Sequence, residues 1–134
     1  MTQALDALAA QMLNAAKAAG ADAADAMAVR GTSLSVDVRA GKLEEAQREE
    51  GTDIGLRVFV GQRSAIVSSS DTTSRTLSEM AERAVAMARE APENPYAGLA
   101  DPAQLARDRD VEALELFDPS DEPAPADLHE DAAQ

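Results

Sequence analysis

Two stretches of the chain repeat apolar residues at intervals of three and four, which is the spacing of an amphipathic helix. Residues 3–19 form the first stretch, with Thr2 as its expected N-cap and Gly20 as its expected end. Residues 73–91 form the second, and the carboxylate of Asp71 is placed to cap its first turn. The pattern therefore predicts one helix on each side of the central part of the chain.

Between these helices apolar residues alternate with polar ones, which predicts strands with one buried face. Gly41 and Gly61 are expected to turn the chain between successive strands, and Gly51 is interpreted in the same way. The alternation is weak in the first segment and clear in the next two, and the last contains a short apolar patch, Ala65-Ile66-Val67, before a run of serines. The segments are residues 24–30, 32–39, 53–60 and 63–69.

The charged segment 42–50, Lys-Leu-Glu-Glu-Ala-Gln-Arg-Glu-Glu, allows two interpretations. Its residue types favour a helix, but such a helix would have only Leu43 and Ala46 to bury. Gly41 and Gly51 bracket the segment at the spacing of a β-hairpin. We therefore expect a strand here.

These elements predict an α+β fold, in which two helices pack on an antiparallel meander of four to five strands, followed by an irregular acidic C-terminal extension. Hydrophobic residues make up 45% of the 134 residues, but Phe59, Tyr96 and Phe117 are the only aromatic ones. The core must therefore consist of aliphatic, methionine and alanine side chains. Its expected members are Leu5, Leu8, Met12, Leu34, Val36, Val38, Ile54, Leu56, Val58, Ile66, Leu77, Met80 and Met87.

The last part of the chain is punctuated by proline and differs in charge from the rest. Residues 1–100 carry 10 basic and 14 acidic side chains, whereas residues 101–134 carry 2 and 11. We expect a domain at 1–100 and, at 101–134, an extension that begins a truncated second region. An acidic disordered tail is the alternative interpretation.

Within the extension, Asp101 and Pro102 are typical of the cap and first residue of a short helical turn. Residues 111–117, Val-Glu-Ala-Leu-Glu-Leu-Phe, could lie on a surface, and residues 118–125 are interpreted as a linker. A helix begins to form at Asp127, too close to Gln134 to complete a second turn.

The net charge of −13 argues against direct binding of nucleic acid or of an anionic membrane. No stretch reaches the roughly 18 consecutive apolar residues of a membrane helix, and the N-terminus lacks the features of a signal peptide. The chain has no cysteine, which excludes disulfides and thiolate chemistry and fits a cytoplasmic protein.

Three patterns suggest catalysis at first sight, and each has a simpler interpretation. His129-Glu130 would begin a zinc-binding His-Glu-x-x-His motif, but Ala133 stands where the second histidine is needed. The carboxylate pairs Glu44-Glu45 and Glu49-Glu50 are adjacent on a strand and so point to opposite faces. Ser68, Ser69 and Ser70 have no histidine near them in the sequence, and we interpret them as a strand end and helix cap. We assign no catalytic, cofactor-binding or metal-ligating residue.

The charged segment 42–50 also has a possible binding role. As an edge strand it could be protected from unwanted pairing by its charges, or it could accept an extended peptide by strand addition. Edge protection is the commoner case, and both interpretations stay open.

The ordered pieces of the sequence resemble the N-terminal domain of the TldD/PmbA family. The resemblance runs through residues 31–71 and includes Gly-Leu-Arg-Val-Phe-Val-Gly at 55–61 and Ser-Ser-Ser-Asp at 68–71. Asn-Pro-Tyr-Ala-Gly-Leu-Ala-Asp-Pro at 94–102 and Leu-Glu-Leu-Phe-Asp-Pro at 114–119 are similar to the PmbA branch, also called TldE. The resemblance covers nearly the whole chain.

The resemblance implies that the chain is the N-terminal part of a protein several times longer. Family members were named as modulators of DNA gyrase and are associated with peptide maturation, and TldD and TldE form a heteromeric metallopeptidase in the bacterial cytosol. Because the zinc motif belongs to the TldD partner and lies beyond this domain, no zinc ligand has a matching position here. No cofactor is therefore expected in this chain.

We accordingly expect a non-catalytic domain of a TldD/TldE-type zinc metallopeptidase complex, contributing assembly and peptide presentation. Its expected partners are a TldD-type protein and an extended or unfolded peptide, without direct contact to nucleic acid or membrane. The alternative is a free-standing acidic interaction protein that modulates a nucleic-acid enzyme such as DNA gyrase. An enzyme in its own right would need a catalytic group that the sequence does not offer.

Overall fold

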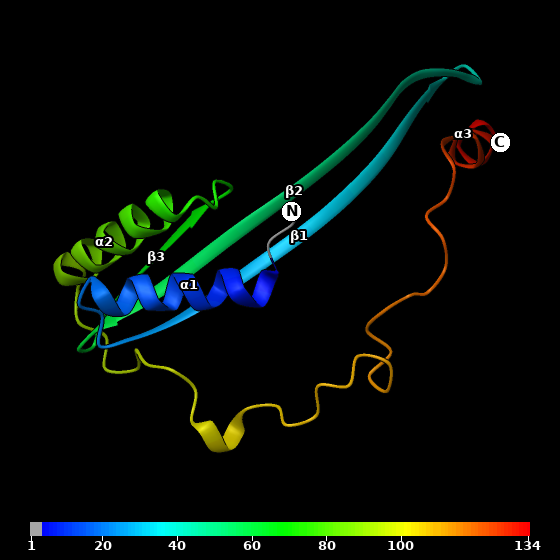
Figure 1. The fold of residues 1–134 in the computed structure, drawn as a ribbon. Coiled ribbons are helices and arrows are strands. Elements are labelled where there is room, and N and C mark those ends of the chain that lie inside the picture. Colours follow the sequence, from blue (N-terminus) through cyan, green and yellow to red (C-terminus); the bar gives the residue numbers. More distant parts are fainter. Residues whose placement is uncertain (1–3) are drawn as a thin grey trace. The chain divides into compact units, whose positions relative to one another are not determined.

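The computed structural model describes residues 4–134 and has an α+β fold, as predicted (Figure 1). The expected N-cap Thr2 lies outside the described residues. The elements are α1 (Leu5–Ala18), β1 (Ala23–Arg39), β2 (Lys42–Val60), β3 (Arg63–Ser69), α2 (Ser74–Glu90), a 3₁₀ turn η1 (Pro102–Gln104) and α3 (Pro125–Ala133).

The chain divides into two compact units, which are described separately below. Unit 1 comprises the N-terminal part up to Gly31 together with Gly51–Leu99. Unit 2 comprises Thr32–Glu50 and Ala100–Gln134. None of the helices within residues 4–134 is both long and apolar enough to cross a bilayer.

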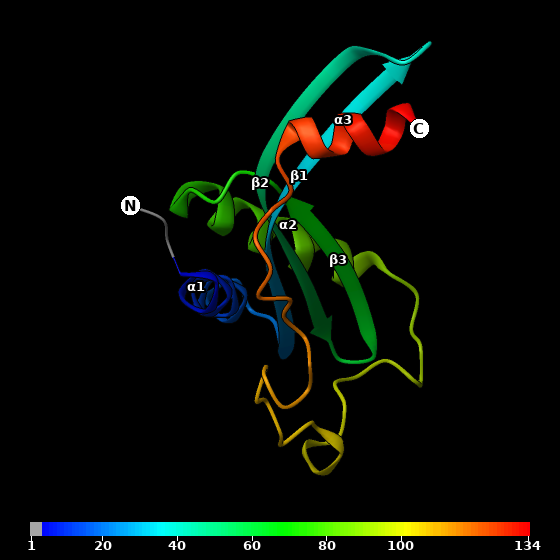
Figure 2. The ribbon, with the colours of Figure 1, turned by 90° about the vertical axis from the view of Figure 1, so that its right-hand side faces the viewer.

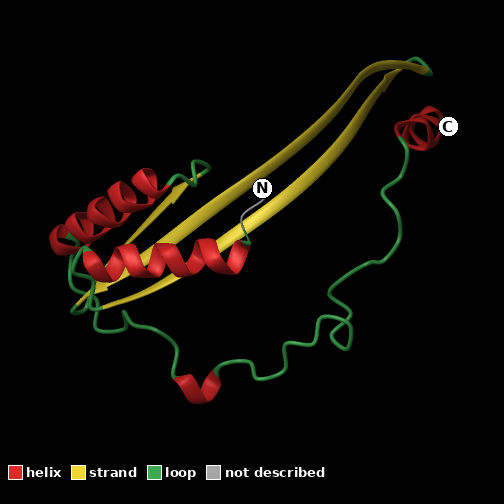
Figure 3. Cartoon of the chain, in the orientation of Figure 1, coloured by secondary structure: helices red, strands yellow, loops and turns green. Residues whose placement is uncertain are grey.

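The sheet has three antiparallel strands in the order β1-β2-β3, so the prediction of four to five strands was wrong. Segments 24–30 and 32–39 are one strand, β1, and segments 42–50 and 53–60 are one strand, β2 (Figure 3). Gly51 does not turn the chain, because the glycines with positive φ are Gly20, Gly41 and Gly61. Glycine within a strand weakens the strand but does not end it.

The turn between β1 and β2 is formed by Ala40 and Gly41, with φ of 51° and 72°. Two consecutive residues with positive φ are the requirement of a type I′ hairpin turn, whose twist matches that of the strands. Gly41 adopts this conformation freely, whereas Ala40 carries a side chain that opposes it. The predicted turn is thus confirmed, and one of its two positions is strained.

Replacing Ala40 with asparagine, the residue most favoured at this position, is expected to stabilise the hairpin by about 1 kcal/mol. Slower hydrogen exchange of the amides next to the turn would show the effect. Ala46→Asn, in the extended part of β2, is the matched control and is not expected to slow exchange. Equal exchange in the Ala40→Asn chain and the unaltered chain would contradict the prediction.

The core of unit 1 lies between one face of the sheet and the two long helices, which contact each other (Figure 1). The prediction is confirmed for the central part of the core, because Leu8, Met12, Ile54, Leu56, Val58, Leu77 and Met80 are buried. Further side chains of this core that are not in the predicted set are Ala16, Ala81, Ala84, Val85 and Ala88. Phe59 is also buried but is not part of this core cluster.

Six predicted core positions are not buried. Ile66 is 68% exposed, because Ala65 and Val67 are the β3 residues that pack toward the core. Met87 is 47% exposed, because the buried stripe of α2 runs through Ala84, Val85 and Ala88 instead. The remaining four are only partly buried: Leu5, Leu34, Val36 and Val38.

The start of α2 differs from the expected arrangement. Thr73 is the N-cap, and its hydroxyl accepts a hydrogen bond from the Thr76 amide at 3.4 Å. The carboxylate of Asp71 instead accepts from the Thr76 hydroxyl at 2.6 Å and from the Thr73 amide at 3.0 Å. These hydrogen bonds, led by that from the Thr76 hydroxyl, lower the pKa of Asp71.

The C-terminal part contains more helix than predicted. Asp101 caps η1 by accepting from the Ala103 amide at 2.9 Å, as expected of an Asp-Pro helix start. However, α3 begins at Pro125 and has nine residues, so the expectation of an incomplete helix from Asp127 was wrong. Proline in the first turn and a 3.3 Å hydrogen bond from the Ala124 amide to Asp127 favour this earlier start.

Candidate interaction surfaces

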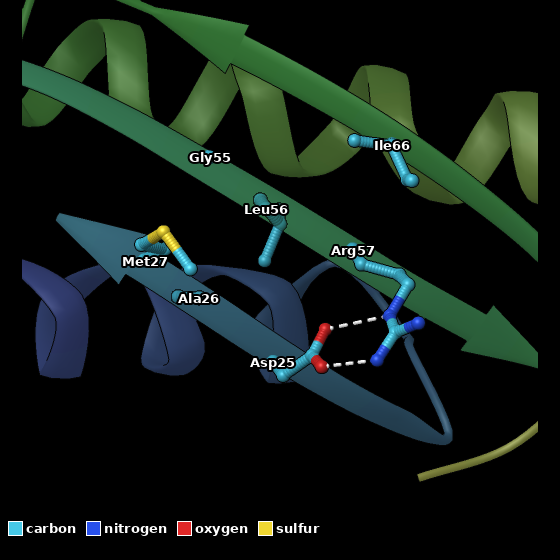
Figure 4. A pocket seen from close by; sticks show the side chains of 7 residues that line it. All are labelled: Asp25, Ala26, Met27, Gly55, Leu56, Arg57 and Ile66. Atoms are coloured by element: carbon cyan, nitrogen blue, oxygen red, sulfur yellow. Dashed lines mark hydrogen bonds and ion pairs between the residues drawn. The ribbon is translucent and has the colours of Figure 1, made fainter.

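The sheet face of unit 1 that points away from the helices forms the first candidate surface. Alternation along the strands places Asp25 and Met27 of β1 on this face, because Ala24, Ala26 and Ala28 pack against the core. Arg57 of β2 lies on the same face, directly opposite Ile66 of β3 in the strand register. Figure 4 shows these side chains around one shallow hollow.

An ion pair connects β1 to β2 across this face. The Arg57 guanidinium donates from Nε to Asp25 Oδ1 at 2.9 Å and from Nη2 to Asp25 Oδ2 (Figure 4). Arg57 also lies over the Phe59 ring, at 5.1 Å from its centroid. Hydrogen bonding to Asp25 raises the pKa of Arg57. The pair therefore holds the guanidinium in a fixed orientation, although both side chains remain accessible.

The hollow next to this pair has a volume of about 330 Å³. Gly55 contributes no side chain, so the backbone of β2 forms part of its floor, while Met27 and Ile66 stand beside it. Met27 and Ile66 are each 68% exposed. This first surface, defined by Asp25, Met27, Gly55, Arg57 and Ile66, is called the open sheet face below. Its exposed apolar side chains beside a fixed ion pair are typical of a protein contact site.

Sequence reasoning missed the open sheet face for an identifiable reason. The residues of β3 contain the apolar run Ala65-Ile66-Val67, in which neighbouring residues lie on opposite faces. The prediction assigned Ile66 to the core, whereas its neighbours Ala65 and Val67 are the residues that face the core. The alternation of Gly55 and Arg57 with the buried Leu56 was the signal that could have placed them on the same exposed face.

A second candidate surface lies within unit 2, on the part of the β1–β2 hairpin formed by residues 32–50, called the hairpin arm below. The pairing of β2 with β3 runs from Ile54 to Val60, so within residues 4–134 no third strand extends along the arm (Figure 2). The charged segment 42–50 is a strand, as predicted, with an edge that β3 does not pair. Whether this edge accepts a peptide stays a prediction.

Arg48 joins the arm to the C-terminal part of unit 2. Its Nη1 donates to Glu122 Oε2 at 2.6 Å, while Nη2 and Nε donate to Glu50 Oε1 at 2.7 and 3.2 Å. The hydrogen bond to Glu122, followed by that to Glu50, raises the pKa of Arg48. A cavity of about 420 Å³ lies beside this contact. It is lined by Leu34, Ala46, Gln47 and Arg48 of the arm and by Glu122, Pro123, Ala124 and Pro125.

The other residues singled out for possible chemistry lie on different elements. His129 is on α3, where its Nε2 is enclosed and has no hydrogen-bond partner. Glu44 pairs with Arg39 at 3.1 Å, and the Ser69 hydroxyl accepts from the Asp71 amide at 3.0 Å. In the part of the chain that the structure describes, no three His, Cys, Asp or Glu side chains form a group that could hold a metal ion.

Comparison with protein families gives a match over most of unit 1 and the hairpin arm. Residues 24–88 match the family described as PmbA/TldA metallopeptidase domain 1. This stretch of the chain is similar to domain 1 of the PmbA/TldD family. The matched range contains all but the first residue of β1, all of β2 and β3, and most of α2. No curated protein sequence matches the chain.

Two solved structures share the fold of this chain. A protein from Bacteroides thetaiotaomicron named as a modulator of DNA gyrase is 18% identical, with a TM-score of 0.71 over 77% of this chain. TldE from Thermococcus kodakarensis is 15% identical, with a TM-score of 0.70 over 94% of this chain. The matches span only 23% and 27% of those two proteins, so the chain corresponds to about a quarter of their length.

Proposed function

We propose that this chain is the non-catalytic N-terminal domain of a TldD/TldE-type zinc metallopeptidase complex, in which it contributes assembly and peptide presentation. Zinc and the hydrolytic chemistry belong, in this proposal, to a TldD-type partner, and the complex works in the bacterial cytoplasm on extended peptides. The family match of residues 24–88 and the fold shared with TldE support the proposal.

The observation that carries the assembly role is the open sheet face. The two helices cover only one face of the sheet, and Met27 and Ile66 remain exposed on the other. Exposed methionine and isoleucine around a fixed arginine are the residue types that form the centre of protein interfaces. A partner that covers Met27 and Ile66 would gain hydrophobic stabilisation without having to break the Arg57–Asp25 pair.

The test is binding of the chain to the TldD-type protein from the same source, measured by isothermal titration calorimetry. Met27→Glu is expected to weaken binding about tenfold or more, because a carboxylate would be buried in an apolar contact. Met87→Glu is the matched control, since Met87 is an exposed methionine on α2, which packs on the other sheet face. It is expected to leave the dissociation constant unchanged.

Three outcomes would count against this function. Equal binding by the Met27→Glu and Met87→Glu chains would remove the open sheet face from the interface. Failure of the unaltered chain to bind any TldD-type protein would remove the assembly role itself. Loss of binding only when residues 101–134 are deleted would favour the alternative function, an acidic interaction protein that acts through its tail. The name of one structural neighbour, a modulator of DNA gyrase, is the observation that favours this alternative.

A further inference from the structure

The C-terminal part of unit 2 contacts the hairpin arm at a point that the assembly role does not use. Glu122 lies 74 positions after Arg48 in the sequence, yet their side chains form a hydrogen-bonded ion pair. Glu122 is followed by Pro123, Ala124 and Pro125, and all four residues line the same cavity as Leu34 and Ala46 of the arm. The chain therefore holds a short acidic, proline-containing segment of its own against the hairpin.

We propose that the hairpin arm is a binding site for a segment in which an acidic residue precedes prolines and small residues, and that Glu122–Pro125, which leads into α3, occupies this site in cis. Arg48 binds the carboxylate, and Leu34 and Ala46 provide the apolar surface for the residues that follow. The proposal stands independently of assembly with a TldD-type protein, because its test needs this chain alone.

The geometry of Arg48 supports recognition of a carboxylate at this position. Nε and Nη2 are both directed to Glu50, which orients the planar guanidinium and leaves Nη1 for Glu122. Glu50 is thus a neighbour on the same strand that holds Arg48 in place, and Glu122 is the ligand group. A fixed guanidinium selects the position of an incoming carboxylate better than a mobile one.

The two prolines decide how the segment is bound. Proline has no amide donor, so Pro123 and Pro125 cannot continue a strand-to-strand ladder. Consistent with this, no backbone hydrogen bond joins residues 122–125 to the arm in the described part of the chain. Recognition therefore rests on side chains and on the restricted backbone of the proline residues, which loses little entropy on binding.

The contact is weak enough to be displaced by a competing segment. The Arg48 and Glu122 side chains are about half exposed, so solvent screens their attraction. The hollow of about 420 Å³ between the arm and the segment is open to solvent, so a competing segment can reach the residues that line it. Covalent attachment keeps the cis segment at high local concentration, so it occupies the site until a competitor of similar chemistry is present.

The first experiment tests the cis contact by NMR on the full chain. Arg48→Glu and Glu122→Arg are each expected to make the amides of residues 122–133 as mobile as a free terminus in heteronuclear NOE measurements. The double variant Arg48→Glu/Glu122→Arg is expected to restore their order. Arg75→Glu, which breaks the exposed Arg75–Glu79 pair of α2, is the matched control and should leave these residues unchanged.

The second experiment titrates the synthetic peptide Asp-Pro-Ser-Asp-Glu-Pro-Ala-Pro-Ala-Asp-Leu-His-Glu-Asp, residues 118–131, into the labelled chain. The peptide is expected to shift the amide signals of Leu34, Ala46 and Arg48. Its dissociation constant is expected to be about fivefold lower for the Glu122→Gln chain than for the unaltered chain. The Glu122→Gln peptide is expected to bind more weakly than the unaltered peptide.

Either of two results would overturn the proposal. Residues 122–133 that are already mobile in the unaltered chain would show that the cis contact does not form. A peptide that produces no shifts on the arm of the Glu122→Gln chain would show that the arm is not a binding site. Unchanged spectra of residues 53–91 in every variant serve as the check that unit 1 remains folded.

Discussion

Leu56→Ala is expected to lower the free energy of unfolding by about 3 kcal/mol, within the range of 2–5 kcal/mol that large-to-small core substitutions cost. Leu56 is 1% exposed and lies in the central strand of the sheet, beneath both long helices. Ala16, Ala81, Ala84 and Ala88 are buried in the same core, and their short side chains cannot extend to fill the vacated space. Urea unfolding followed by far-ultraviolet circular dichroism measures the loss.

Ile66→Ala provides the control for this prediction. Ile66 pairs with Arg57, next to Leu56, but its side chain lies on the open sheet face. A loss of less than about 0.5 kcal/mol is expected there, as for most exposed substitutions. Similar losses for Leu56→Ala and Ile66→Ala would mean that both sheet faces are covered, which contradicts the one-sided core.

The second large effect is expected from Ala84→Leu, which should destabilise the fold by about 1–3 kcal/mol. Ala84 of α2 is completely buried, together with Ala81 and Ala88 on the same stripe and Ala16 on α1. Small side chains at these positions allow α1 and α2 to approach each other and the sheet. Three added carbon atoms would force the elements apart. The unfolding midpoint in urea measures the change.

Ala86→Leu tests whether the effect depends on position. Ala86 lies on the exposed side of the same helix, two residues from Ala84, and leucine has a helix propensity close to that of alanine. A change of less than about 0.5 kcal/mol is expected. If Ala86→Leu destabilised the protein as much as Ala84→Leu, helix propensity rather than packing would be responsible.

The sequence pattern predicted which segments are helices and strands better than it predicted where the strands end. The hairpin spacing of Gly41 and Gly51, and the lack of apolar residues for a helix to bury, predicted a strand at 42–50 against the helical propensity of its glutamates, and the structure confirms it. The same argument failed at Gly51, which continues β2. Glycine allows both a turn and an extended backbone, so its presence alone does not distinguish them. At Gly41 the backbone forms a turn because β1, which precedes it, and β2, which follows it, pair with each other in the sheet.

The two candidate surfaces were predictable to different degrees. The open sheet face follows from alternation once Ala65 and Val67 are assigned to the core, so its residues could be found from the sequence. The Arg48–Glu122 contact could not, because the two residues are far apart in the chain and neither lies in an apolar pattern that predicts their approach. Long-range ion pairs between exposed side chains leave no periodic signal.

The short turns at Ala40-Gly41 and Gly61-Gln62 have a consequence for the order in which the protein assembles during synthesis. Each strand pairs with the one that precedes it in the chain, so the sheet can form as soon as Ser69 has left the ribosome. Helix α1 is synthesised before the sheet, yet its buried stripe has to wait for the sheet and then for α2. Among the elements of this core, α1 is therefore the one whose apolar side chains remain unprotected for longest.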